Sequence, residues 1–276
     1  YMITLSFYVF AIELNGFSIN NPLVKQTHIL SGGPPRDGIP AIDDPKFVKV
    51  DDMLLRSLGE DERAIVVERK GIKKVYPINI LNWHEIVNDQ ISGKSIVVSY
   101  CPLCGSGIVF SSSINNRRLT FGVSGLLYQS DVLLYDRESN SLWSQLLMMS
   151  VNGPRKGEQL EIVASRNVNL EQYLFENSDA TVLSRNSFAS QTRDYDRNPY
   201  GNYEKTEGIY FPVYYSDTTF HAKTWTLLIK IKGDSMLVPI SKLKGNLSKV
   251  IVKFMNLSIP IFYDKKKNEI YCLKYQ

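Results

Sequence analysis

The length and spacing of the apolar segments constrain the fold of this chain more than any other feature. In the middle of the chain, residues 119–123, 130–135 and 141–149 are short apolar segments separated by Gly, Asp, Asn or Ser. Short runs bounded by turn residues are typical of β-strands, because amphipathic helices need longer stretches. The sequence therefore predicts antiparallel β structure through the middle of the chain.

A hairpin followed by a helix is predicted just before this region. Residues 64–68 and 73–76 have the composition of two strands around a Lys-Gly turn. Pro77 then occupies a position that favours the start of a helix, which we expect over residues 78–88. The spacing of the apolar residues puts His84 on the apolar side of that helix.

The pattern of residues 64–110 recurs in weaker form at residues 226–272. Val238-Pro239-Ile240 resembles Tyr76-Pro77-Ile78 at the same distance from a glycine. The second stretch has Asp264-Lys265-Lys266-Lys267 where the first has its two cysteines. We therefore predict an α+β fold, mainly antiparallel β with a few helices, in which a duplicated hairpin–helix–strand unit flanks the β-rich middle.

Composition excludes several classes of protein. The chain has 276 residues, of which 43% are hydrophobic and 22% charged, as in ordinary globular proteins. The net charge of +4 comes from scattered basic residues, so no stripe is present that could follow a nucleic-acid backbone. Three cysteines are too few for a disulfide framework, and they exclude a zinc site made of four cysteines.

The N-terminal segment suggests export. Residues 1–12 form an apolar run that is too short to span a bilayer, and residues 15–44, rich in Gly, Pro, Asn and Ser, follow as an irregular lead-in. The run is interpreted as the remnant of a signal peptide or membrane anchor, with a first β-strand as the alternative. We expect residues 1–37 to form this remnant and linker, residues 38–276 to form a single domain, and the protein to be extracytoplasmic or membrane-anchored.

Cys101 and Cys104 are the strongest chemical signal. They lie three positions apart on a turn that follows a predicted buried strand, residues 96–100. Such a pair can cycle between dithiol and disulfide, or hold a soft metal such as copper or zinc, or form a static disulfide. Residues 105–110 have the pattern of a turn and a strand, whereas a thioredoxin places its cysteines at the start of a long helix.

Two further side chains are candidates for the same site. His84 can act as a third metal ligand or as a base beside a thiol, and Asp131 as an acid. The predicted catalytic residues are Cys101, Cys104, His84 and Asp131, and the predicted metal ligands are Cys101, Cys104 and His84. Three protein ligands leave one coordination position open for a small-molecule ligand. A thiol–disulfide oxidoreductase and a non-catalytic binding module remain the alternatives.

Several motifs in order resemble one known family. They are Tyr100-Cys101-Pro102-Leu103-Cys104-Gly105-Ser106, Phe121-Gly122-Val123-Ser124-Gly125-Leu126-Leu127, Tyr135-Asp136-Arg137, Ser141-Leu142-Trp143-Ser144-Gln145 and Asn198-Pro199-Tyr200. Together they are similar to the bacterial and archaeal domain of unknown function 3179, from about Gly38 to the C-terminus. The resemblance implies a protein that is often exported or membrane-tethered, and it implies no established activity.

Overall fold

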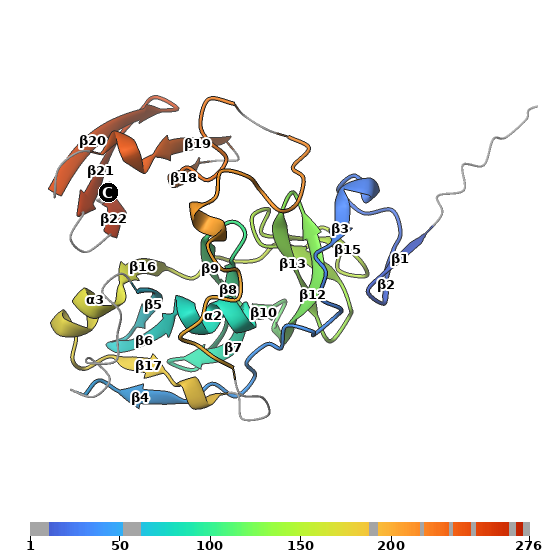
Figure 1. The fold of residues 1–276 in the computed structure, drawn as a ribbon, viewed down its shortest axis with the longest axis horizontal. Coiled ribbons are helices and arrows are strands. Elements are labelled where there is room, and N and C mark those ends of the chain that lie inside the picture. Colours follow the sequence, from blue (N-terminus) through green and yellow to red (C-terminus); the bar gives the residue numbers. More distant parts are fainter. Residues whose placement is uncertain are drawn as a thin grey trace, which may run out of the picture. The chain divides into compact units, whose positions relative to one another are not determined.

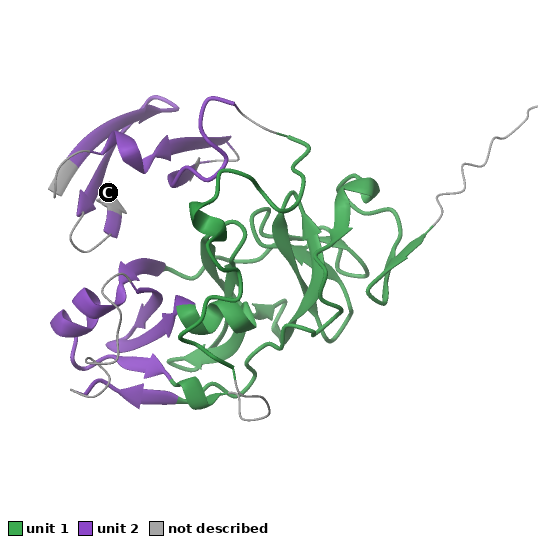
Figure 2. Ribbon diagram, in the orientation of Figure 1, with its two compact units in different colours: residues 1–46, 79–164, 184–215 green, residues 47–78, 165–183, 216–276 purple. Residues whose placement is uncertain are grey.

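The structure is a computed structural model that describes residues 11–51, 62–187, 193–215, 218–231, 234–243, 247–264 and 269–272 (Figure 1). The α+β prediction is confirmed in its coarse form, because the described residues form mostly antiparallel strands and two short α-helices. Neither of these helices has the length and apolar character needed to cross a membrane. The chain divides into two compact units, the first comprising residues 1–46, 79–164 and 184–215, and the second residues 47–78, 165–183 and 216–276 (Figure 2).

The largest sheet of the first unit contains the predicted β-rich middle of the chain. Its strand order is β15-β14-β13-β12-β3, and every neighbouring pair is antiparallel. The strands are β3 (Ile29–Ser31), β12 (Phe121–Tyr128), β13 (Asp131–Asp136), β14 (Leu142–Ser144) and β15 (Met149–Asn152). Gln129 and Ser130 connect β12 to β13, and both have positive φ, as the tight two-residue hairpin turn requires.

A second sheet of this unit carries the cysteines. Strands β7 (Ile86–Ile91), β8 (Lys94–Cys101) and β9 (Ser106–Ser111) form an antiparallel meander after helix α2 (Ile78–His84). The expectation of a helix over residues 78–88 is wrong beyond His84. Glu85 has a φ of +56°, which ends the helix, and residues 86–91 instead pair with β8.

The remaining elements of the first unit are short. They are β1 (Ile12–Leu14), β2 (Phe17–Ile19), η1 (Gln26–His28), β10 (Ser113–Ile114), β11 (Arg117–Arg118), η2 (Arg185–Ser187) and η3 (Tyr203–Lys205). The lead-in over residues 15–44, expected to be irregular, therefore contains strands. Phe17 and Ile19 are buried there, and β3 pairs with β12, a partner far along the sequence.

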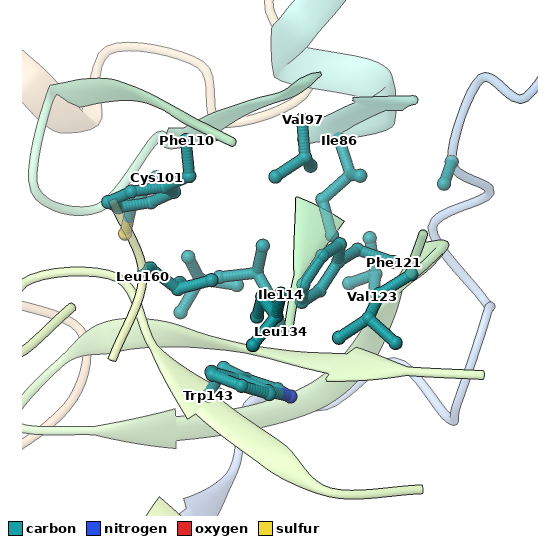
Figure 3. Packing of buried hydrophobic residues seen from close by; sticks show 13 residues of the cluster. Ile86, Val97, Cys101, Phe110, Ile114, Phe121, Val123, Leu134, Trp143 and Leu160 are labelled. Carbon is teal, nitrogen blue, oxygen red and sulfur yellow. The ribbon is translucent and has the colours of Figure 1, made fainter. Parts of the chain in front are cut away.

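The core of the first unit lies against the cysteine-bearing strand. Phe110 and Val97 of the β7-β8-β9 sheet belong to one buried cluster with Phe121 and Trp143 of the larger sheet, and Cys101 is a member (Figure 3). Replacing an aromatic residue of such a core by alanine typically costs about 3–5 kcal/mol. Close packing of this kind leaves the backbone at Cys101 little freedom to move.

The second unit contains a five-stranded sheet and two smaller ones. The five-stranded sheet has the order β16-β5-β6-β17-β4, with β17 parallel to β6. Its strands are β4 (Phe47–Lys49), β5 (Arg63–Arg69), β6 (Ile72–Pro77), β16 (Ser165–Asn169) and β17 (Thr181–Leu183). Helix α3 (Leu170–Glu176) starts at Asn169, whose side chain accepts a hydrogen bond from the Gln172 amide. Leu170, Tyr173 and Leu174 pack on the β5-β6 hairpin.

The C-terminal stretch of this unit is a hairpin followed by a short helix and a meander. Its elements are β18 (Thr226–Ile231), β19 (Asp234–Pro239), η4 (Ile240–Lys242), β20 (Leu247–Phe254), β21 (Leu257–Asp264) and β22 (Glu269–Cys272). Val238, Leu243 and Ile261 form its small buried core.

Candidate functional site

The two cysteines lie on the connection between β8 and β9, with different exposure. Cys101 is the last residue of β8 and pairs with Ser106, so its thiol is fixed in the core and only 1% of the residue is exposed. Cys104 lies on the turn and is exposed. Its amide donates to the carbonyl of Cys101, and Gly105 has a φ of +63° that lets the chain return into β9. Both cysteines are free thiols.

The β12-β13 hairpin brings Asp131 to these thiols. The carbonyl of Ser130 accepts from the Cys104 thiol at 3.4 Å, and the Cys101 thiol approaches the same oxygen at 3.9 Å. The Cys104 thiol also approaches Asp131 Oδ1 at 3.7 Å. One ligand atom from each of Cys101, Cys104 and Asp131 lies within 4.8 Å of the other two. Three of the four predicted site residues therefore meet, two from the end of β8 and the turn after it and one from the start of β13.

Hydrogen bonds from the turn between β14 and β15 hold this arrangement. The Leu146 amide donates to Asp131 Oδ2 at 3.1 Å, which fixes the carboxylate while its other oxygen faces Cys104. Gln145, fully buried, donates to Ser99 Oγ and accepts from Ser106 Oγ at 2.7 Å. These two serines lie on β8 and β9, so Gln145 ties the cysteine hairpin to the larger sheet.

Glu85 and Tyr200 were not identified from the sequence as site residues. Glu85 is 6% exposed, its backbone carbonyl accepts from the Tyr100 amide, and its Oε1 accepts from the Tyr200 hydroxyl at 2.8 Å. A carboxylate directly after an apolar helix face was the one available signal for Glu85. Tyr200 belongs to the motif Asn198-Pro199-Tyr200, but it comes from a stretch with no periodicity, so nothing in the sequence placed it beside Glu85.

The site concentrates acidic groups away from water. Burial raises the pKa of Asp131 to about 7, although hydrogen bonds from the Leu146 amide and the thiols act in the opposite direction. Burial raises the pKa of Glu85 to about 7 against the Tyr200 hydrogen bond, and the charge of Asp131 adds to the rise. Burial, with Cys104 and the two carboxylates nearby, raises the pKa of the Cys101 thiol.

A compensating cation is missing from the side chains described around these acids. Within the described ranges, no ion pair joins Asp131 or Glu85 to a lysine, arginine or histidine. Buried anions without a compensating positive charge are costly even where they accept hydrogen bonds, so such groups bind either protons or a cation.

His84 is fully buried and has a different environment. One ring nitrogen, Nδ1, lies 2.7 Å from the carbonyl oxygen of Pro40, and the other, Nε2, lies 2.8 Å from the Tyr195 hydroxyl. Burial lowers the pKa of this imidazole. His84 does not belong to the group formed by Cys101, Cys104 and Asp131. Its role as a ligand or base stays a prediction.

The donor set fits a metal ion of intermediate softness. Zinc binds thiolates and carboxylates in tetrahedral geometry, and reactive zinc sites have three protein ligands and one open position. Copper(I) favours thiolates and thioethers, so a carboxylate ligand fits it less well. Cys101, Cys104 and Asp131 would hold the ion, and the exposed position of Cys104 puts one side of the group near solvent.

Comparisons with known proteins support the family resemblance. No curated protein and no solved structure matches the chain. The profile of the family described as "Protein of unknown function (DUF3179)" matches residues 36–274, which is most of the chain. The chain, with its Cys101–Cys104 pair beside Asp131, therefore belongs to the DUF3179 family.

Proposed function

We propose that this protein binds a zinc ion through Cys101, Cys104 and Asp131 and uses the fourth coordination position for a small molecule. The observation that supports this most directly is that the three ligand atoms lie within 4.8 Å of one another. In tetrahedral coordination with bonds of about 2.3 Å, two sulfur ligands are about 3.8 Å apart. A sulfur and a carboxylate oxygen are about 3.5 Å apart in the same geometry, so the side chains need to close by at most about 1.3 Å.

The charges around the site favour the same assignment. Two thiolates and one carboxylate carry three negative charges, and a divalent cation compensates two of them. A protonated Glu85 adds no further charge, which agrees with its pKa of about 7. The cation would relieve the desolvation that otherwise disfavours ionised Asp131 and Cys101.

The residues beside the ligands have separate tasks in this proposal. A zinc ion with an open position supplies Lewis acidity and lowers the pKa of bound water. With a pKa of about 7, Glu85 can take up or release a proton near neutral pH, and the Tyr200 hydroxyl orients its Oε1. The carbonyl of Ser130 accepts from the thiols while they are protonated. These features support metal-assisted chemistry on a small molecule.

Metal analysis tests the proposal directly. We expect about one zinc ion per chain in protein purified under reducing conditions, and loss of that metal in Cys101→Ser, Cys104→Ser and Asp131→Asn. Cys272→Ser, which removes the chain's third cysteine, is the matched control and should keep the metal. Wild-type protein that fails to take up zinc, or variants that bind it as tightly as wild type, would refute the proposal.

The second candidate function is thiol–disulfide exchange. The pairing of an exposed Cys104 with a buried Cys101 favours it, because one thiol can attack a partner while the other resolves the mixed disulfide. The raised pKa of Cys101 disfavours the resolving step, because the resolving thiol must ionise to attack the mixed disulfide. An oxidising reduction potential without metal affinity would select this function. A potential below about −300 mV would select a static disulfide in a non-catalytic module.

We propose that zinc affinity also tests whether His84 is a metal ligand. If His84 is a ligand, one ring nitrogen must leave Pro40 or Tyr195. His84→Gln should then weaken zinc binding about as much as Asp131→Asn. Unchanged zinc affinity in a folded His84→Gln variant would remove it from the ligand set.

We also infer that residues 226–272 are a second copy of residues 64–110. The pairing Ala64–Pro77 corresponds to Thr226–Pro239. In the meanders, Ile91–Lys94 corresponds to Phe254–Leu257, and Cys101–Ser106 to Asp264–Glu269, with an unchanged register.

The second copy would carry Asp264 at the position of Cys101. The copies therefore differ at the metal site, which supports placing the function in the first one. An experimental structure with a different strand register in residues 247–272 would contradict the duplication.

We propose that the protein works outside the cytoplasm, on the basis of the apolar run at residues 1–12, of which residues 1–10 lie outside the described residues. Its proposed ligands are a metal ion and a small molecule, and nucleic acid is not among them. Fractionation of cells that produce the protein should place it outside the cytoplasm or at the membrane. Recovery in the cytoplasmic fraction would contradict this location.

A further inference from the structure

A polar cavity in the first unit is lined by residues that are not part of the cysteine site. It has a volume of about 540 Å³, within the usual range for small-molecule sites. The β10-β11 hairpin supplies Arg117 and Arg118 to its lining, and the loop before β16 supplies Arg155 and Glu158. Glu138 completes the charged lining.

The carboxylates of this cavity already have hydrogen-bond donors. Glu138 accepts from the backbone amide of Thr120 at 3.0 Å and from its hydroxyl at 2.7 Å. Glu158 accepts from Arg155 Nη1 at 2.9 Å. Neither carboxylate is paired with Arg117 or Arg118.

Arg155 is fixed in the wall of the cavity. Its side chain is 14% exposed, and its Nε lies 3.7 Å from Asp136 Oδ1. The backbone amide of Arg155 donates to Ser141 Oγ, which anchors the loop. Asp136 also accepts hydrogen bonds from the Trp143 side chain and the Ser139 amide, so Arg155 is not the only group that stabilises its negative charge. The Nε atom of Arg155 is buried and has no hydrogen-bond partner.

Arg117 and Arg118 are the unpaired charges of the cavity. Both are exposed, and neither side chain forms a hydrogen bond or ion pair with any described residue, although their backbone pairs with β10. A guanidinium group offers five donors in a planar fork that matches the oxygens of phosphate. Two such groups beside a fixed third one give a concave surface with donors for an anion.

We propose that this cavity binds the phosphate group of a small molecule, with Arg117 and Arg118 as the main contacts and Arg155 as a fixed donor. A dianionic tetrahedral oxyanion uses the unpaired donors of two guanidinium groups more fully than a single carboxylate does. The assignment is independent of the metal site, because no residue is shared between the two.

Phosphate titration by calorimetry tests the proposal, with inorganic phosphate as the probe and chloride at constant ionic strength as the reference. We expect saturable one-to-one binding by wild-type protein. Arg117→Ser and Arg118→Ser should each weaken it about tenfold or more, since one hydrogen bond to a charged group is removed. Lys94→Ser, which removes an exposed positive charge elsewhere in the first unit, is the control and should bind as wild type.

A further variant separates this cavity from the cysteine site, where phosphate could reach a bound metal. Cys101→Ser with Cys104→Ser should bind phosphate as tightly as wild type, whatever its metal content. Loss of phosphate binding in this double variant would overturn the assignment. Equal binding by the arginine variants, binding of acetate but not phosphate, or no binding at millimolar phosphate would also overturn it.

Discussion

At the scale of single residues, the two cysteines should differ in reactivity. In reduced, metal-free protein we expect iodoacetamide to modify Cys104 first and Cys101 more than tenfold more slowly. Cys104 is exposed, whereas Cys101 is buried and its pKa is raised, and each unit of pKa reduces the thiolate fraction tenfold at neutral pH. Peptide mapping by mass spectrometry measures both rates, with urea-unfolded protein as the control. Equal rates in the folded protein would contradict the described burial.

Glu85 should make the stability of the metal-free protein depend on pH. Its folded pKa of about 7 exceeds the ordinary value of 4.5, so folding binds a proton. Stability is therefore lost as the pH rises from about 4.5 through about 7, by up to about 3 kcal/mol for this group. Glu85→Gln retains an oxygen for the Tyr200 hydroxyl and should reduce this loss. Urea denaturation at several pH values measures the slope, and identical slopes would exclude Glu85 as its source.

The sequence predicted the members of the candidate site only in part. Cys101, Cys104 and Asp131 were candidates because their chemistry is visible in the residue type. Glu85 and Tyr200 were missed because their contact joins the end of α2 to a segment without periodicity. The carbonyl of Ser130 was also missed, since a backbone acceptor leaves no trace in the side-chain sequence.

At the scale of elements, the β5-β6 and β18-β19 hairpins should respond differently when an apolar side chain in the middle of a strand is replaced by alanine. Val66 pairs with Val75 and is buried under α3, whereas Leu228 pairs with Leu237 and is 42% exposed. Val66→Ala should lower the free energy of unfolding by about 2 kcal/mol, and Leu228→Ala by less than about 1 kcal/mol. Urea denaturation measures both. A larger loss for Leu228→Ala would show that its face is covered in the folded protein.

Hairpins were predictable from the sequence, while long-range pairings were not. The β5-β6 hairpin follows from two short apolar runs around a turn, and both strands have local partners. Strand β3 depends on β12, which lies far along the chain, so its polar surroundings resembled a linker. The helix predicted over residues 78–88 ended early because strand pairing with β8 outweighed local periodicity beyond Glu85.

At the scale of the whole molecule, Asp131 should have opposite effects on stability without and with zinc. It should destabilise the metal-free protein, and it should be required for stabilisation by the metal. In metal-free protein at pH 8, ionised Asp131 is buried at a cost, because its folded pKa of about 7 is above the ordinary 3.8. Asp131→Asn should therefore raise the melting temperature of the metal-free protein. Zinc at 100 times its dissociation constant should stabilise the wild type by about 2.7 kcal/mol and leave this variant nearly unchanged.

Thermal unfolding with and without zinc measures both effects in one experiment. Asp179→Asn is the control, because Asp179 is an exposed partner of Lys73 in the second unit and should leave the zinc response intact. A purely structural role for Asp131 predicts a loss of stability without metal and an unchanged zinc response. The two accounts predict opposite signs for the change in melting temperature of metal-free Asp131→Asn. They also predict different stabilisation of this variant by zinc, so one variant decides between them.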